Sequence, residues 1–170
     1  MISRFARVLA AGLTLALGCS ASLPPGAPSA ALGQSVSFEL PSDRGALVPL
    51  PQPGARATVI DAWAPTCVPC RDKVPALFAR RAELEAAGAR LVLVAVLSED
   101  ETTEAARAAL KSWGVDSPFL VDRGGVLRRE CAIEALPATA VIAAGGRVRW
   151  LATAESTAAD VVAATRAVTE

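Results

Sequence analysis

Apolar and polar residues along this chain follow the periods of both strands and helices. From Gln34 to Leu40 every second residue is apolar, which predicts a half-buried strand. Residues 57–62 and 90–97 are apolar almost throughout and predict strands covered on both faces. A run of helical period follows each of these two strands. The middle of the chain is therefore expected to alternate between strand and helix.

The two central helices carry recognisable end signals. The first is expected over about 68–87, with Gly88 as its stop. Ser98 and Glu101 form the Ser-x-x-Glu pattern of a capping box, which predicts the start of the second helix. Gly114 is expected to end that helix.

Shorter elements fill the rest of the chain. Residues 47–50 add a strand that two prolines confine to a sheet edge. The remaining strands are expected at 118–121, 138–143 and 147–152, and the remaining helices at 126–131 and 156–168. The last two strands flank a Gly-Gly turn and form an antiparallel hairpin. The order of elements predicts an α/β domain in which a central mixed β-sheet lies between helices.

The first residues have the features of an export signal. Two arginines precede an uncharged run, 8–17, that is shorter than the roughly 20 residues of a membrane span. Residues 1–18 are therefore expected to be a secretory signal peptide. The residues before Cys19 resemble the lipobox of bacterial lipoproteins, although Ala16 stands where that motif prefers leucine. The alternative is an ordinary cleaved signal with no role for Cys19.

A lipidated Cys19 would anchor the protein to a membrane through its N-terminus. Residues 19–33 are rich in proline, serine and alanine and are expected to be a flexible tether. Residues 34–170 would then form one folded domain, which is long enough for a substantial core.

Composition excludes several classes of function. The 170 residues contain 17 Lys and Arg and 17 Asp and Glu, so the formal net charge is zero and no basic surface for nucleic acid is expected. The chain has no histidine, which removes Ser-His-Asp and Cys-His catalysis. Cysteine, carboxylate and lysine side chains are the remaining reactive groups.

The chemistry is concentrated in Cys67 and Cys70, a Cys-x-x-Cys pair at the junction between a predicted strand and a helix. The positive end of a helix stabilises a thiolate, so Cys67 is the candidate nucleophile. Cys70 follows one helical turn later and is the candidate resolving cysteine. A structural zinc site would need a second ligand pair, but the chain has no histidine and neither Cys19 nor Cys131 repeats the Cys-x-x-Cys spacing, so neither metal nor other cofactor is expected. A structural disulfide without redox activity remains the simpler alternative.

The residues around the pair resemble the active-site signature of the thioredoxin superfamily: Trp63-Ala64-x-x-Cys67-x-Pro69-Cys70. Further matches are Asp61, Pro75 in the following helix, and Leu136-Pro137-Ala138-Thr139, which resembles the cis-proline segment. The arrangement is most similar to the TlpA/ResA-like extracytoplasmic thiol-disulfide oxidoreductases. The resemblance implies a thioredoxin-like fold with an N-terminal strand extension and an inserted βα unit.

The resemblance also assigns roles to residues. Cys67 would attack, Cys70 would resolve, and Asp61 would transfer the proton of Cys70; the alternative for Asp61 is a strand-end carboxylate that faces solvent. Substrate would contact four further residues, namely Trp63, Pro69, Leu136 and Pro137. Ala138 departs from the family, which usually has threonine directly after the proline. Cys131 is expected to be a buried, inert cysteine, with a third redox thiol as the alternative.

The expected function is therefore a thiol-disulfide oxidoreductase of the periplasmic side of the cell envelope. The resemblance implies that it reduces disulfides of exported proteins and receives electrons from a membrane donor. An oxidase or isomerase is the alternative enzyme, against which Pro69 argues because such proteins commonly carry histidine at that position. A redox-inactive thioredoxin-like binding module is the alternative outside catalysis.

Overall fold

The computed structural model describes residues 22–170. The strands are β1 (Phe38–Pro41), β2 (Leu47–Leu50), β3 (Ala57–Trp63), β4 (Ala89–Val96), β5 (Leu120–Asp122), β6 (Ala138–Ala143) and β7 (Val148–Leu151). The helices are α1 (Cys70–Phe78), α2 (Arg81–Ala86), α3 (Thr103–Ser112), α4 (Val126–Cys131) and α5 (Ala158–Thr169). No helix among these residues is long and apolar enough to cross a membrane.

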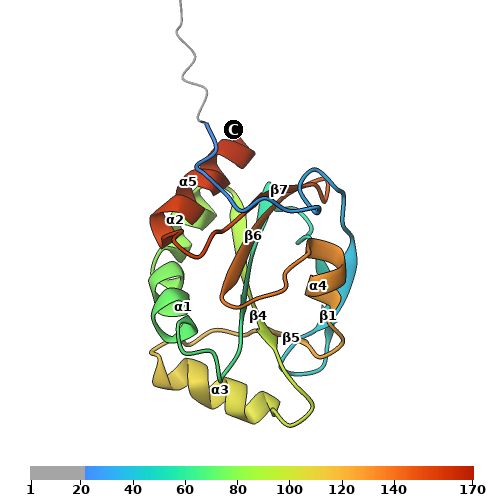
Figure 1. The fold of residues 1–170 in the computed structure, drawn as a ribbon, viewed down its shortest axis with the longest axis vertical. Coiled ribbons are helices and arrows are strands. Elements are labelled where there is room, and N and C mark those ends of the chain that lie inside the picture. The colour runs from blue at the N-terminus through green and yellow to red at the C-terminus, as the bar shows by residue number, and fades with distance from the viewer. Residues whose placement is uncertain (1–21) are drawn as a thin grey trace, which may run out of the picture.

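The five strands β3–β7 form one mixed sheet with the order β5-β4-β3-β6-β7. β3 is parallel to β4 and antiparallel to β6, and all seven of its residues are buried. Figure 1 shows α1, α2 and α5 together on one side of the sheet and α4 on the other side. The predicted mixed sheet between helices is confirmed.

Each face of the sheet has its own core. Val59 of β3 and Val141 of β6 pack against residues of α1, α2 and α5. Ile60 of β3 and Ile142 of β6 face the opposite way and pack with α4 and with the separate β1–β2 hairpin. Successive side chains of a strand point to opposite faces, so the nearly continuous apolar sequence of β3 serves both cores.

The first predicted helix is interrupted. The sequence predicts one helix over 68–87, whereas α1 ends at Phe78 and α2 begins at Arg81. Arg80 leaves helical geometry with φ −92° and ψ 6°, and its N–H bonds to the carbonyl of Leu77 three residues back. A tight three-residue turn therefore replaces one turn of α-helix. Gly88 follows α2 with φ +80°, as expected for a helix stop.

The predicted capping box does not cap a helix. Glu101 does accept hydrogen bonds from Ser98, but α3 begins only at Thr103. Thr102 is the N-cap, because its hydroxyl accepts the N–H of Ala105 at 3.0 Å. Ser98 and Glu101 belong instead to the loop between β4 and α3.

The segment before β1 lies along β7. The N–H of Ala27 bonds to the carbonyl of Leu151 at 2.8 Å, and the indole N–H of Trp150 bonds to the carbonyl of Pro24 at 3.0 Å. A Cβ atom on Gly26 would lie 2.7 Å from the Trp150 indole nitrogen, so the contact requires glycine. The flexible tether predicted over 19–33 is therefore wrong from Pro24 onward, because these residues hydrogen-bond to the edge strand.

Candidate active site

Cys67 and Cys70 form a disulfide at the end of β3 and the start of α1. The S–S distance is 2.06 Å and the two Cα atoms lie 5.3 Å apart. The N–H of Cys67 bonds to the carbonyl of Ala64, and the N–H of Cys70 bonds to the carbonyl of Cys67. Cys67 is partly exposed whereas Cys70 is fully buried. A molecule arriving from solvent can therefore reach the sulfur of Cys67 but not that of Cys70.

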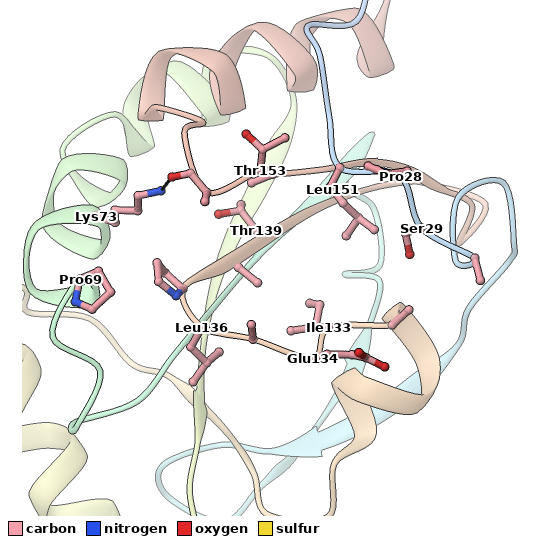
Figure 2. A pocket seen from close by; sticks show the side chains of 18 residues that line it. Pro28, Ser29, Pro69, Lys73, Ile133, Glu134, Leu136, Thr139, Leu151 and Thr153 are labelled. Carbon is pink, nitrogen blue, oxygen red and sulfur yellow. Dashed lines mark hydrogen bonds between the residues drawn. The ribbon is translucent and has the colours of Figure 1, made fainter.

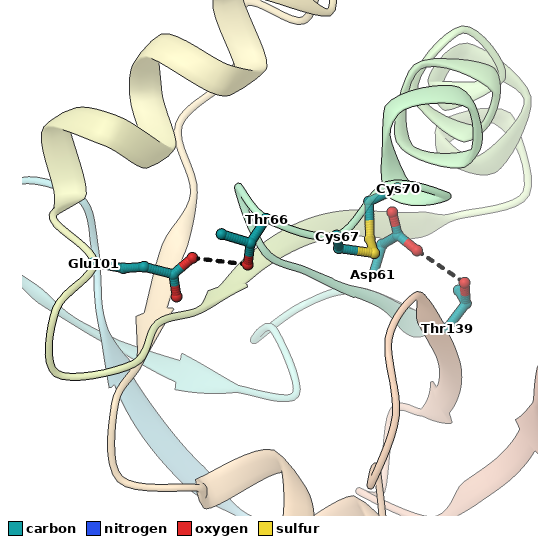
Figure 3. Close-up of a disulfide and its surroundings, with 6 residues drawn as sticks. All are labelled: Asp61, Thr66, Cys67, Cys70, Glu101 and Thr139. Carbon is teal, nitrogen blue, oxygen red and sulfur yellow. Dashed lines mark hydrogen bonds between the residues drawn. A yellow bond between two sulfur atoms is a disulfide. The ribbon is translucent and has the colours of Figure 1, made fainter.

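The Asp61 carboxyl group lies beside the disulfide (Figure 3). Its Oδ1 accepts a hydrogen bond of 2.8 Å from the hydroxyl of Thr139, and its Oδ2 is buried with no partner among the described residues. Burial raises the pKa of Asp61 to about 7, against the hydrogen bond from Thr139 and the positive charge of Lys73, which lower it. The predicted alternative of a carboxylate facing solvent is wrong, because Asp61 is only 3 % exposed.

A cavity of about 320 Å³ reaches Asp61 from the side of α1 and α5. Thr139, Thr153 and Ser156 are among its polar lining residues, and Lys73 also lines it. The ammonium group of Lys73 bonds to the carbonyl of Ala154 at 2.6 Å, which links α1 to the loop between β7 and α5. The volume is large enough for ordered water, and Thr139, Thr153 and Ser156 offer it hydrogen-bonding groups.

A larger groove of about 850 Å³ opens next to Pro69, the residue that precedes Cys70 (Figure 2). Three of the residues predicted to contact substrate, Pro69, Leu136 and Pro137, line it. The peptide bond between Leu136 and Pro137 is cis, as predicted. Residues 27–30 of the N-terminal segment form part of the opposite wall. Most of the lining is apolar.

Trp63 does not line the groove. Its side chain is fully buried and packs edge-on against the rings of Trp113, at 5.4 Å between centroids, and Phe119, at 5.7 Å. The predicted substrate contact by Trp63 is therefore wrong, because no substrate on this surface can touch it. Its contribution is to anchor the end of β3 in the core.

The sequence analysis includes Thr139 in the cis-proline segment but assigns it no role in the site. Thr139 lies opposite Asp61 in the antiparallel pairing of β3 and β6. The register between strands 78 residues apart places the hydroxyl against the carboxyl group. No local pattern could reveal this contact.

A second missed contact joins Thr66 to the loop between β4 and α3. The Thr66 hydroxyl donates a hydrogen bond of 3.0 Å to Oε1 of Glu101, on the other side of the disulfide from Thr139 (Figure 3). Hydrogen bonds from Ser98 and Thr66 lower the pKa of Glu101. Glu101 therefore stays ionised at neutral pH beside the residue that precedes Cys67.

Cys131 does not belong to the site. Cys131 is fully buried at the end of α4, and burial raises the pKa of its thiol to about 12. A neutral, inaccessible thiol is unreactive, which agrees with the inert cysteine that was predicted. Cys19 and the signal peptide predicted over 1–18 lie outside the described residues.

Comparison with known proteins assigns the family. The family model described as Redoxin matches residues 28–167. The chain belongs to the Redoxin family. No curated protein sequence matches this Redoxin-family chain.

Solved structures share the fold of this Redoxin-family chain. A secreted thiol-disulfide isomerase from Corynebacterium glutamicum is 23% identical with a TM-score of 0.68 over 81% of this chain and 86% of that chain. A thiol:disulfide interchange protein from Chlorobium tepidum TLS is 19% identical with a TM-score of 0.66 over 85% and 100%. An exposed lipoprotein thioredoxin from Streptococcus pneumoniae is 19% identical with a TM-score of 0.61 over 77% and 98%.

The predicted thioredoxin-like fold is confirmed by these matches. With its disulfide in Cys-x-x-Cys spacing, this Redoxin-family member is a thioredoxin-like oxidoreductase.

Proposed function

We propose that this protein is an exported enzyme that reduces disulfides of other exported proteins through Cys67 and Cys70. The observation that carries the proposal is the unequal placement of the two sulfurs, with Cys67 partly exposed and Cys70 buried beside the Asp61 carboxyl group. A reducing enzyme needs one cysteine that reaches the substrate and a second that is protected until it resolves the mixed disulfide.

The reaction begins from the dithiol form. The Cys67 thiolate attacks one sulfur of the substrate disulfide, forms a mixed disulfide, and releases the other substrate sulfur as a thiolate. Cys70 then attacks the sulfur of Cys67 and releases the second substrate thiolate. Two electrons pass from the enzyme to the substrate, the enzyme is left with the Cys67–Cys70 disulfide, and the substrate gains two thiols.

Asp61 acts in the second step. Cys70 must lose its proton before it attacks, and the Asp61 carboxylate accepts it. A pKa of about 7 suits this role, because the group is partly ionised at neutral pH and can pass the proton on through the cavity that contains Lys73. The unpartnered Oδ2 is the oxygen available for the transfer.

The groove next to Pro69 is the proposed substrate site. An extended segment of an unfolded or flexible protein would lie along Leu136 and Pro137 with its disulfide at Cys67. The apolar lining favours segments that carry apolar residues next to the cysteine. Pro69, directly before Cys70 in the chain, lines the groove on the side of α1.

Export and anchoring belong to the same proposal. A signal peptide over 1–18 and a lipid on Cys19 would place the domain on the periplasmic side of a membrane, where a membrane protein could return electrons to the Cys67–Cys70 disulfide. The structural neighbours include a protein described as secreted and another described as an exposed lipoprotein, and these descriptions support an extracytoplasmic location.

The test is the reduction potential of the purified protein, equilibrated with glutathione or dithiothreitol. A value near that of thioredoxin, about −270 mV, is expected, and a value toward that of a strong oxidase, about −120 mV, would favour an oxidase. The Cys70→Ala variant should trap a mixed disulfide with a disulfide-bonded test protein, whereas Cys67→Ala should trap none. A protein without a reversible couple would be a binding module and would contradict the proposal.

A further inference from the structure

The loop between β4 and α3 brings a carboxylate to the residue before Cys67. Oε1 of Glu101 accepts the Thr66 hydroxyl at 3.0 Å. Its Oε2 accepts the N–H of Ser98 at 2.9 Å and the hydroxyl of Ser98 at 3.1 Å. Both oxygens of the carboxylate are therefore held, one by the active-site turn and one by its own loop.

Arg123 also holds the backbone of this loop. Arg123, which follows β5, donates hydrogen bonds to the carbonyls of Ser98 at 2.8 Å and Glu101 at 2.7 Å. The guanidinium group thus binds the backbone of the loop, and the Glu101 carboxylate remains directed at Thr66. These contacts restrict Glu101 to one position next to the active site.

Two neighbouring acids provide a comparison within the same loop. Glu99 and Asp100 are exposed, and within residues 22–170 their side chains form no hydrogen bond or ion pair. Of the three acidic side chains in this loop, Glu101 is the one that contacts the active-site turn. Figure 3 shows Thr66 between the Glu101 carboxylate and the disulfide.

We propose that Glu101 is a positioning residue that, through Thr66, places a fixed negative charge beside Cys67 and makes the Cys67–Cys70 couple more reducing. The inference rests on the proposed redox function. A negative charge disfavours a nearby thiolate, whereas the start of α1 favours it. Because reduction of the disulfide creates the Cys67 thiolate, a less stable thiolate means that the dithiol gives up its electrons more readily.

The balanced reaction defines the measurement. Two molecules of reduced glutathione convert the enzyme disulfide to the enzyme dithiol and become one molecule of glutathione disulfide, so two electrons are transferred to the enzyme. Glu101→Gln keeps the shape of the side chain and removes its charge. We expect this variant to shift the equilibrium toward the dithiol by about threefold, which corresponds to roughly 15 mV for a two-electron couple.

Glu99→Gln is the matched control, because it removes the same charge from the same loop without a contact to Thr66. Its potential should equal that of the wild type. The Glu101→Gln shift should also shrink in high salt, because the interaction is near the surface and is screened. Equal shifts in the two variants, or no shift in Glu101→Gln, would overturn the proposal.

Thr66 provides a second, independent test. Thr66→Val removes the hydroxyl that holds Glu101 and should shift the potential in the same direction as Glu101→Gln. Thr66→Ser retains the hydroxyl and should restore the wild-type potential. If Thr66→Val behaves as the wild type, Glu101 does not act through Thr66 and the inference is wrong.

The same experiment separates this inference from the proposed function. A wild-type potential in the oxidase range with the expected Glu101→Gln shift would contradict the reducing direction and support the role of Glu101. A wild-type potential near that of thioredoxin without the shift would support the reductase and overturn the role of Glu101. A wild type without any reversible couple would overturn both.

Discussion

Two threonine–carboxylate pairs flank the same disulfide, and the pKa values of their carboxyl groups are shifted in opposite directions. Thr139 donates to Asp61 at 2.8 Å on one side, and Thr66 donates to Glu101 at 3.0 Å on the other. The hydrogen bonds are alike, yet the pKa of Asp61 is raised to about 7 and that of Glu101 is lowered. Asp61 is 3 % exposed, whereas Glu101 lies near the surface.

Burial decides the difference. A single hydroxyl cannot replace the water that a fully buried carboxylate loses, so the neutral form of Asp61 is favoured. Glu101 keeps contact with solvent and gains hydrogen bonds from Ser98 as well, so its charged form is favoured. The buried pair is suited to proton transfer, and the surface pair is suited to holding a charge.

The largest effect is expected on stability after Asp61→Asn. Between about pH 4 and pH 7 the folded protein holds the Asp61 proton and the unfolded chain does not, so the free energy of unfolding falls as pH rises through this range and stays low above it. A pKa displaced from 3.8 to about 7 corresponds to at most about 4 kcal/mol. The oxidised Asp61→Asn variant should be more stable than the wild type by up to this amount at pH 8.

Urea unfolding at pH 5 and pH 8 measures this effect. Asp72→Asn is the control, because Asp72 is exposed and lines the same cavity. It should leave the difference between the two pH values unchanged. If Asp61→Asn unfolds with the pH dependence of the wild type, the pKa of Asp61 is not raised in the folded protein. The contrast with Glu101 would then disappear.

The next effect is expected on the rate at which Cys70 resolves the mixed disulfide. Asp61→Asn removes the proton acceptor and should slow this step by about 100-fold at pH 7, the lower end of general acid–base contributions. Mixing the reduced protein with oxidised glutathione, followed by acid quench and mass spectrometry, would show the mixed disulfide with Cys67 accumulating. A fast resolving step in this variant would exclude Asp61 as the proton acceptor.

A smaller effect is expected from Thr139→Val. Loss of the hydroxyl removes a hydrogen bond that lowers the pKa of Asp61, so this pKa should rise by about one unit. Fewer carboxyl groups are then ionised at pH 7, and resolution should slow by about fivefold there and recover near pH 9. Thr139→Ser should keep the wild-type pH profile. A uniform loss of rate at all pH values would point to a packing defect.

The smallest effect is expected from Lys73→Gln. Its positive charge lowers the pKa of Asp61, but Lys73 is half-buried and solvent screens it. Resolution at pH 7 should slow by about twofold in low salt and by less in high salt. Arg71→Gln removes an exposed positive charge from the same helix and should have no effect. Equal effects of the two variants would show that only the overall charge of α1 matters.

Local sequence patterns predicted the boundaries of a helix or strand well where turn residues mark its ends. α4 and β6 have the predicted bounds, because a Gly-Gly turn precedes α4, and Pro137 and a second Gly-Gly turn flank β6. The prediction of one helix over 68–87 is wrong at Arg80. The helical spacing of apolar residues continues on both sides of the break, so the sequence pattern does not reveal it. The Ser98–Glu101 pattern predicts a helix cap, but the same hydrogen bonds also form in a loop that no helix follows directly. The pattern alone therefore does not locate the start of α3.

The sequence alone was sufficient to predict the order of strands and helices, the family resemblance, the pairing of Cys67 with Cys70, and a buried Asp61. These features depend on short spacings and on residue chemistry that neighbouring residues reveal. The tertiary structure alone decided that Trp63 is buried, that residues 24–33 lie along β7, and that Thr139 and Glu101 lie on opposite sides of the disulfide. Strand register and loop placement bring together residues far apart in sequence, and the protonation of each carboxyl group follows from the burial that this packing creates.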